Sequence, residues 1–269
     1  MIEQNIDNFT LIKYDSMNEF YKYICDTPFN EAFRWEKHSS VEGSSYFTKT
    51  ENFEEAVDLL KNGWSDMAQQ LTKKLKVETT NEFVGTKRKN IYDVVGYQAS
   101  VPRYLQGVPN SMVRSINTPV KNKVVTLIKS IDYAGGVSVD TIVEESIKAM
   151  RIIKKLEAQG LKINLDIAFG TKAGGSNFIG RIRIKNANER LNVSKLAFPL
   201  VHPSMLRRLI FRWIEVYPKI TKSFVNGYGR PVQTSDLQAI AKEKEYVLPA
   251  IICTDINSIK SLDDLKVIQ

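Results

Sequence analysis

The side chains with the clearest chemical potential are cations gathered between residues 181 and 212. Glu189 is the only acidic residue in that stretch. Side chains alternate between the two faces of a strand, so the cations of the strand predicted at 177–185 form a row on one face. Such clusters neutralise nucleic-acid phosphates; they also suit an acidic protein partner, or protect a sheet edge from pairing. The predicted binding surface consists of Arg181, Arg183, Lys185, Arg190, Arg207, Arg208 and Arg212.

A second candidate is the loop that follows the strand predicted at 124–128. Open α/β sheets bind ligands outside the carboxyl ends of their strands, and a helix N-terminus attracts anions. The loop has neither a G-x-G-x-x-G pattern nor a P-loop lysine, and a simple glycine turn between strand and helix explains the same residues. The predicted loop site consists of Asp132, Tyr133, Gly135 and Gly136.

Catalytic candidates are sparse. Asp166 and Asp255 lie in or just after predicted strands and could converge with Asp132 as acid, base or metal ligands, although such residues more often cap helices or face solvent. His38 and His202 are bases by type, but no serine or cysteine sits in a nucleophile elbow. Two cysteines and two histidines this far apart do not make a zinc site. The sequence therefore predicts no catalytic residue, no metal and no cofactor.

The candidate sites depend on a strand–helix–strand unit. Residues 124–128 form a short, mostly β-branched run, as expected of a strand buried on both faces. Residues 142–159 carry an apolar stripe at helical spacing, and residues 162–169 alternate apolar and polar side chains. Two strands joined by such a helix are parallel, and the connection between them is right-handed. A short turn then makes the strand at 177–185 antiparallel, at the edge of the sheet.

The rest of the chain reads as helical in its first part and irregular in its middle. A strand is predicted at 9–14, followed by helices at 16–24, 52–60 and 65–75. Residues 79–121 are poorly periodic, and a long irregular segment usually wraps a surface or carries a site. We predict an N-terminal α-rich lobe over residues 1–120, which includes this segment, and an α/β domain over 121–269.

Charge is unevenly distributed along the chain. The 269 residues carry a net charge of +8; residues 1–60 hold five Lys/Arg against twelve Asp/Glu, or −7, so the remainder carries +15. An acidic head on a basic body favours self-docking or a polyanionic partner. No apolar run approaches the ~20 residues that span a bilayer, and no secretory signal is visible at Met1, so we expect a cytoplasmic protein without membrane contact.

Several blocks carry a family resemblance. They are residues 44–56 with Asn62-Gly63-Trp64, residues 93–96 with 101–109, and the run from His202 to Arg208. Together with the central unit they resemble a family of uncharacterised proteins encoded by bacteriophages and prophages. The resemblance implies a phage origin and synthesis in the cytoplasm of an infected bacterial host, and association with the virion is compatible with it. It implies nothing about chemistry.

The order of the central elements also resembles a von Willebrand factor A-like domain. That family has a strand, a metal-binding loop, a long helix, a second strand and an antiparallel edge strand. Its metal loop needs an aspartate with serines two and four residues later, whereas Asp132 is followed by Ala134 and Gly136 at those places. A hard cation needs several oxygen ligands, so the resemblance implies a degenerate domain without its metal.

Three functions follow as hypotheses. The first is a non-enzymatic, phage-encoded binding protein that holds a protein partner through the basic surface or the loop. The second is a sequence-independent nucleic-acid binder of phage replication or packaging. The third is a hydrolase or nuclease with a metal at Asp132. The oligomeric state is not predicted.

Overall fold

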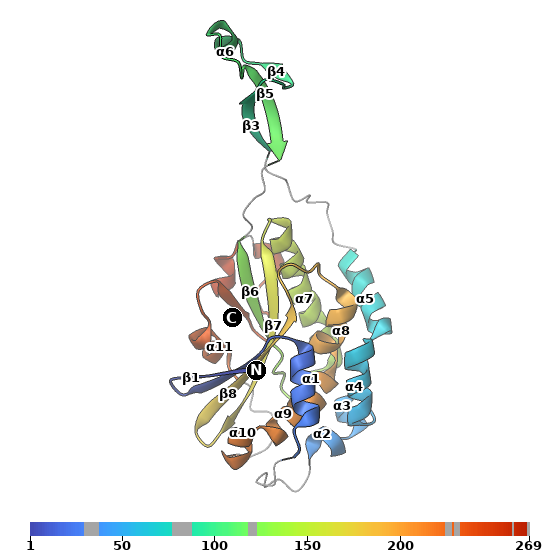
Figure 1. Cartoon of the computed structure of the whole chain (residues 1–269). Coiled ribbons are helices and arrows are strands. Elements are labelled where there is room, and N and C mark those ends of the chain that lie inside the picture. Colours follow the sequence, from blue (N-terminus) through green and yellow to red (C-terminus); the bar gives the residue numbers. More distant parts are fainter. Residues whose placement is uncertain are drawn as a thin grey trace.

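The computed structural model describes residues 1–29, 38–76, 88–117, 123–223, 228, 232–259 and 261–267. Within these residues the protein is a mixed α/β structure with a mostly parallel six-stranded sheet, and a smaller three-stranded sheet lies apart from it (Figure 1). No helix in the described ranges is both long and apolar enough to cross a bilayer.

The large sheet has the strand order β1-β2-β8-β7-β6-β9. Its strands are β1 (Ile2–Ile6), β2 (Phe9–Tyr14), β6 (Val124–Ser130), β7 (Lys162–Ala173), β8 (Ser176–Lys185) and β9 (Glu245–Leu248). Strands β6 and β7 are parallel, with Leu127 opposite Leu165, and α7 (Val139–Ala158) connects them. The predicted strand–helix–strand unit is therefore confirmed. Its helix begins three residues earlier than the sequence pattern indicates, because Ser138 is the N-cap and accepts a hydrogen bond from the Thr141 amide.

Strand β8 is antiparallel to β7, as predicted, but its expected position at the edge of the sheet is wrong. On its other side β2 pairs with it in parallel, with Leu11 opposite Ile179, and β1 extends the sheet further. Residues 1–14 thus supply two strands of the main sheet, which the predicted division near residue 120 does not foresee. The partners are more than 160 residues apart in the chain, so no local pattern could reveal their pairing.

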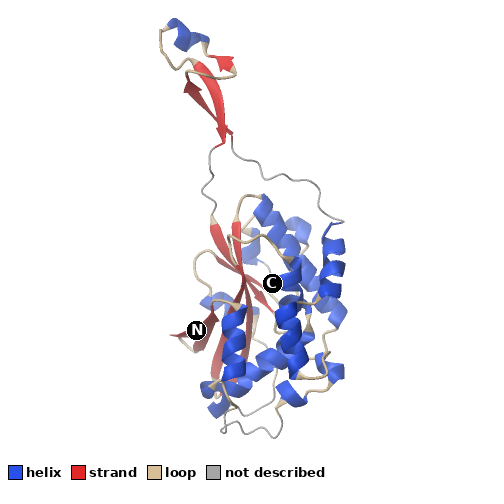
Figure 2. Cartoon of the chain, turned by 45° about the vertical axis from the view of Figure 1, so that its right-hand side comes forward, coloured by secondary structure: helices blue, strands red, loops and turns tan. Residues whose placement is uncertain are grey.

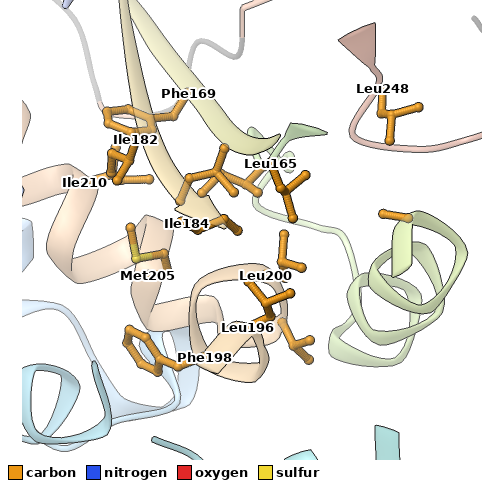
Figure 3. Close-up of a cluster of buried hydrophobic side chains, with 14 of the residues drawn as sticks. Leu165, Phe169, Ile182, Ile184, Leu196, Phe198, Leu200, Met205, Ile210 and Leu248 are labelled. Carbon is orange, nitrogen blue, oxygen red and sulfur yellow. The ribbon is translucent and has the colours of Figure 1, made fainter. Parts of the chain in front are cut away.

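Helices cover the sheet unequally. The larger hydrophobic core lies between one face of the sheet and most of the helices (Figure 3). These helices include α1 (Met17–Asp26), α4 (Phe53–Asn62), α5 (Ser65–Lys76), α8 (Val193–Val201), the π-helix η1 (Met205–Ile210) and α9 (Phe211–Val216). The opposite face has a smaller core, to which α11 (Thr234–Ile240) contributes Leu237 and Ile240. Short elements complete the main body: α2 (Ser39–Glu42), α3 (Ser45–Thr48), α10 (Pro218–Ser223) and the 3-10 turns η2 (Ile256–Ser258) and η3 (Asp264–Val267).

Gly180 in β8 shows how closely the larger core is packed. A Cβ atom there would lie 2.3 Å from Cε2 of Phe169, whose ring packs edge-on against Trp213 with centroids 5.1 Å apart. Because the ring cannot move freely, we expect Gly180→Ala to lower the free energy of unfolding by about 1–3 kcal/mol through overpacking. Urea unfolding followed by circular dichroism measures this. The control is Gly136→Ala, since a Cβ there meets no atom within 4 Å; equal stability of the two variants would contradict the packing argument.

The three-stranded unit spans residues 88–117, inside the segment predicted to be irregular. It contains β3 (Arg88–Asp93), β4 (Gln98–Ala99), α6 (Val101–Leu105) and β5 (Met112–Asn117), with β5 in the middle of its sheet. Figures 1 and 2 both show the unit beyond one end of the main body. Gly96 permits the backbone before β4 to pass close to β5, because a Cβ at that position would lie 2.2 Å from the carbonyl oxygen of Val113.

Candidate functional site

The row of cations on β8 is largely internal. Arg181 is only 2% exposed and lies between Asp166 (Nη2–Oδ2 2.7 Å) and Glu245 (Nη1–Oε2 2.9 Å). Lys185 is equally buried and donates to Glu157 (Nζ–Oε1 2.7 Å) and to the Ile163 carbonyl. The expectation that these cations form an exposed surface is therefore wrong. A buried cation requires a carboxylate, and here the carboxylates come from the neighbouring strand β7 (Asp166), from β9 (Glu245) and from helix α7 (Glu157).

The arginines on η1 and α9 are also turned inward. Arg208 is fully buried, and its guanidinium donates to backbone carbonyls of the segment 40–50. Its acceptors are the carbonyl oxygens of Ser40, Val41, Gly43 and Thr50 and the hydroxyl of Thr50, at 2.7–3.1 Å. Arg207 bonds the carbonyls of Phe47 and Gly135, and the guanidinium of Arg212 lies 3.4 Å from the ring centroid of Phe29.

Little of the predicted basic surface is accessible. Arg190 is exposed, and Arg183 and Arg212 are half-buried. Arg183 is also engaged, because its guanidinium is hydrogen-bonded to Asp166. The binding role of the seven residues stays a prediction, and the burial of four of them does not favour it.

Asp132 in the loop after β6 is buried and acts as a connector. Its Oδ2 accepts hydrogen bonds from the amides of Gly170 (2.8 Å) and Val232 (3.2 Å), which ties the end of β6 to β7 and to the segment that precedes α11. Burial raises the pKa of this carboxyl to about 7, although the two amides act in the opposite direction. Tyr133 is also buried, whereas Gly135 and Gly136 are exposed.

The space beside Asp132 is small. A cavity of about 80 Å³ is lined by Asp132, Gly170, Arg207, Phe47 and other residues. Pockets that bind organic ligands usually measure about 300–1,000 Å³, so this cavity suits ordered water rather than a substrate. The other predicted aspartates do not extend the site: Asp166 pairs with arginines of β8, and Asp255 caps η2. In the described ranges no three His, Cys, Asp or Glu side chains group together as a metal ion would require.

Two buried titratable groups near this end of the sheet have shifted pKa values. Lys129 on β6 donates to the carbonyls of Pro249 (2.5 Å) and Ala250 (2.7 Å), and burial lowers the pKa of its ammonium to about 7. His202 accepts from the Ser204 amide through Nδ1 (3.1 Å), and burial lowers its pKa to about 4. Sequence reasoning missed Lys129, whose signal is a lysine inside an apolar strand.

A larger groove of about 480 Å³ lies at the carboxyl ends of the parallel strands β2 and β8. Its lining includes the cations Lys61, Arg183 and Lys195. Each already has a partner: Lys61 lies over the Tyr21 ring, Arg183 bonds Asp166, and Lys195 pairs with Glu189. Two of these three cations are therefore already neutralised by a carboxylate, while Lys61 keeps its charge over a neutral ring.

Among the described residues, exposed large apolar side chains are concentrated on the three-stranded unit. None of its described side chains, residues 89–116, is buried. Its exposed large apolar residues are Tyr92, Val94, Val95, Tyr97, Val101, Tyr104 and Leu105, the last with 78% of its surface accessible. Such a concentration makes the unit a candidate interaction site. The available sequence signal was the apolar pairs 94–95 and 104–105 in a segment without helical or strand periodicity.

Comparison with known proteins gives one match. The family described as "Domain of unknown function (DUF7192)" matches residues 2–266, and so extends over both predicted domains. No curated protein and no solved structure matches the chain.

Proposed function

We propose that this chain, which belongs to the family described as Domain of unknown function (DUF7192), is a non-enzymatic binding protein that holds a protein partner through the three-stranded unit. The observation that supports the proposal is the absence of any buried side chain among residues 89–116. Ordering each residue costs about 1–2 kcal/mol of backbone entropy. Small sheets need a covered hydrophobic face to offset that cost, so a partner that covers the unit would complete its core.

Polar contacts give the unit a defined shape for binding. The guanidinium of Arg103 lies 4.2 Å from the Tyr92 ring centroid and donates to the Asn110 carbonyl. Arg114 on β5 pairs with Asp93 at the end of β3 (Nη1–Oδ2 3.2 Å). An ordered binding surface loses less entropy on association than a disordered one, so these contacts favour recognition by a preformed unit.

Two finer parts of the proposal derive from sequence resemblance. We propose a phage-encoded protein that acts in the host cytoplasm or on the virion; the blocks at 44–56 and 93–109 support this. We also propose a degenerate von Willebrand A-like core. The succession β6, loop, α7, β7 and antiparallel β8 supports that likeness, and the inner position of β8 is a departure from it.

The alternative function is sequence-independent nucleic-acid binding. Residues 88–117 hold four Lys/Arg and one Asp, a net charge of +3, and exposed tyrosines can stack on bases. We place it second, since Arg103 and Arg114 are already engaged and the aliphatic side chains offer bases no stacking surface. The third hypothesis, a metal-dependent hydrolase or nuclease, rests on Asp132; it requires an activity that chelator and Asp132→Ala both abolish.

Affinity isolation tests the proposal. The tagged full chain and its Tyr104→Ser/Leu105→Ser variant are used to capture proteins from extracts of the producing cells, with and without nuclease. We expect a captured protein that the variant recovers about tenfold less well, which corresponds to about 1.4 kcal/mol of binding energy, and that nuclease leaves in place. Both side chains are exposed, so the variant should keep its fold.

The control variant is Ile2→Ser/Ile251→Ser, which removes exposed apolar side chains of the main body. Equal recovery by all three proteins would contradict a role for the unit. Loss of the captured material with nuclease would favour the alternative, and a filter-binding titration would then show affinity falling steeply with salt.

A further inference from the structure

We infer that the partner of the three-stranded unit is a second copy of this chain, bound through its acidic N-terminal region. This inference rests on the proposed function and names the partner. It follows from the surface of the main body, where residues 39–62 combine exposed acidic and apolar side chains. We call these the acidic face: Val41, Glu42, Tyr46, Glu51, Glu54, Glu55 and Asp58.

The acidic face occupies one region of the main body. Its residues lie on or beside α2, α3 and α4, and all three helices pack against η1. Arg208 on η1 is held by this segment through its backbone carbonyls, so the face rests on a fixed support. Figure 1 shows the three-stranded unit beyond the end of the main body opposite α2 and α3. The unit is therefore placed to meet this face on another copy.

The two surfaces are complementary in charge. Residues 39–62 contain five Asp/Glu and two Lys, a net charge of −3, whereas residues 88–117 carry +3. Opposite electrostatic potentials favour association of two surfaces, and like potentials disfavour it. A contact between two three-stranded units would instead bring +3 against +3, which disfavours a symmetric dimer through this element.

The two surfaces also match in polarity. Val41 (49% exposed) and Tyr46 (85% exposed) are among the few large apolar residues that the main body exposes. They offer apolar contact to Tyr104 and Leu105, and the acidic residues around them are complementary to the net charge of +3 on the unit, which includes the exposed Lys89. An apolar centre with a charged rim is the usual composition of a protein interface.

The geometry of such a contact has a consequence for assembly. Unit and face are different patches, so each copy retains one of each after the first contact. Contacts between different patches close a two-copy ring when they are reciprocal, and otherwise build larger rings or open chains. We therefore expect species of at least twice the 30.6 kDa of one chain.

Light scattering coupled to gel filtration tests the inference on the full chain at rising concentration. We expect the mass to exceed one chain at low salt and to fall as salt screens the charges. The unit variant Tyr104→Ser/Leu105→Ser and the face variant Glu54→Lys/Asp58→Lys should each remain monomeric. The control for the face variant is Asp140→Lys/Glu144→Lys, a similarly exposed acidic pair at the same positions of α7, which should assemble like the unaltered chain.

Mixing the two variants distinguishes this contact from any other. The unit variant keeps an intact face and the face variant keeps an intact unit, so equal amounts should form a complex of one copy of each and nothing larger. A symmetric contact between units would instead leave the face variant able to assemble alone. Thermal melts of each variant confirm that the fold is kept.

A full chain that stays monomeric at every concentration would overturn the inference and would leave the proposed function standing, with another protein as the partner. Failure of the isolation experiment, with assembly and mixing behaving as described, would instead confine binding to self-association.

Discussion

Replacing Arg208 by alanine is expected to lower the free energy of unfolding by about 3–5 kcal/mol, because several acceptors lose their shared donor and the packing of a buried side chain is lost. The guanidinium is the shared donor for four carbonyls of the segment 40–50 and for the Thr50 hydroxyl. Without it the carbonyls of Ser40, Val41 and Gly43 lose this donor, at about 1–3 kcal/mol for each that water cannot reach, whereas the two oxygens of Thr50 keep Thr48 and Ser204 as partners. Denaturant unfolding followed by circular dichroism gives the difference.

Two further variants identify the cause. Arg190→Ala removes an exposed arginine of the same predicted binding surface and should change stability by less than about 0.5 kcal/mol. Arg208→Lys keeps the charge but not the planar set of donors, so it should remain strongly destabilised. A loss near zero for Arg208→Ala, or full rescue by lysine, would contradict the hydrogen-bonding role.

The same arginine shows what the sequence could and could not reveal. Its type and its position in a basic run are visible in the sequence, and both suggested a surface. Burial came from a segment about 160 residues away whose carbonyls surround it, and no pattern near residue 208 records that contact. Arg181 and Lys185 repeat the lesson, because their carboxylate partners arrive through strand pairing and packing in three dimensions.

Local structure was predicted well where the chain buries one face of a regular element. The helix at 139–158 and its two strands have the periodicity that burial imposes, and they were found. The strands of residues 88–117 bury no face. Their sequence therefore has no alternation of apolar and polar side chains from which strands could be predicted. The absence of periodicity and the absence of any buried side chain among residues 89–116 thus have the same physical origin, a small sheet without a covered face among the described residues; the proposed partner would supply that cover.

The second large effect concerns the pH dependence of stability, and Asp132 is its source. Burial raises the pKa of this carboxyl from 3.8 to about 7 in the folded protein. Between about pH 4 and 7 the unfolded chain has released this proton and the folded chain still holds it, so the contribution of Asp132 to stability falls as pH rises. About three pKa units at 1.36 kcal/mol each amount to about 4 kcal/mol. Below pH 4 and above pH 7 the contribution is constant.

Comparison with Asp132→Asn isolates that contribution. The amide oxygen can still accept from Gly170 and Val232, but the side chain no longer titrates. Over pH 4–7 the stability of the unaltered protein relative to the variant should therefore fall by about 4 kcal/mol in denaturant titrations. His202, whose pKa is lowered to about 4, works in the opposite direction over part of this range, but it is present in both proteins and cancels. A difference that stays flat, or that rises with pH, would show that the folded protein stabilises the ionised carboxylate through the two amides, and that its desolvation is the smaller effect.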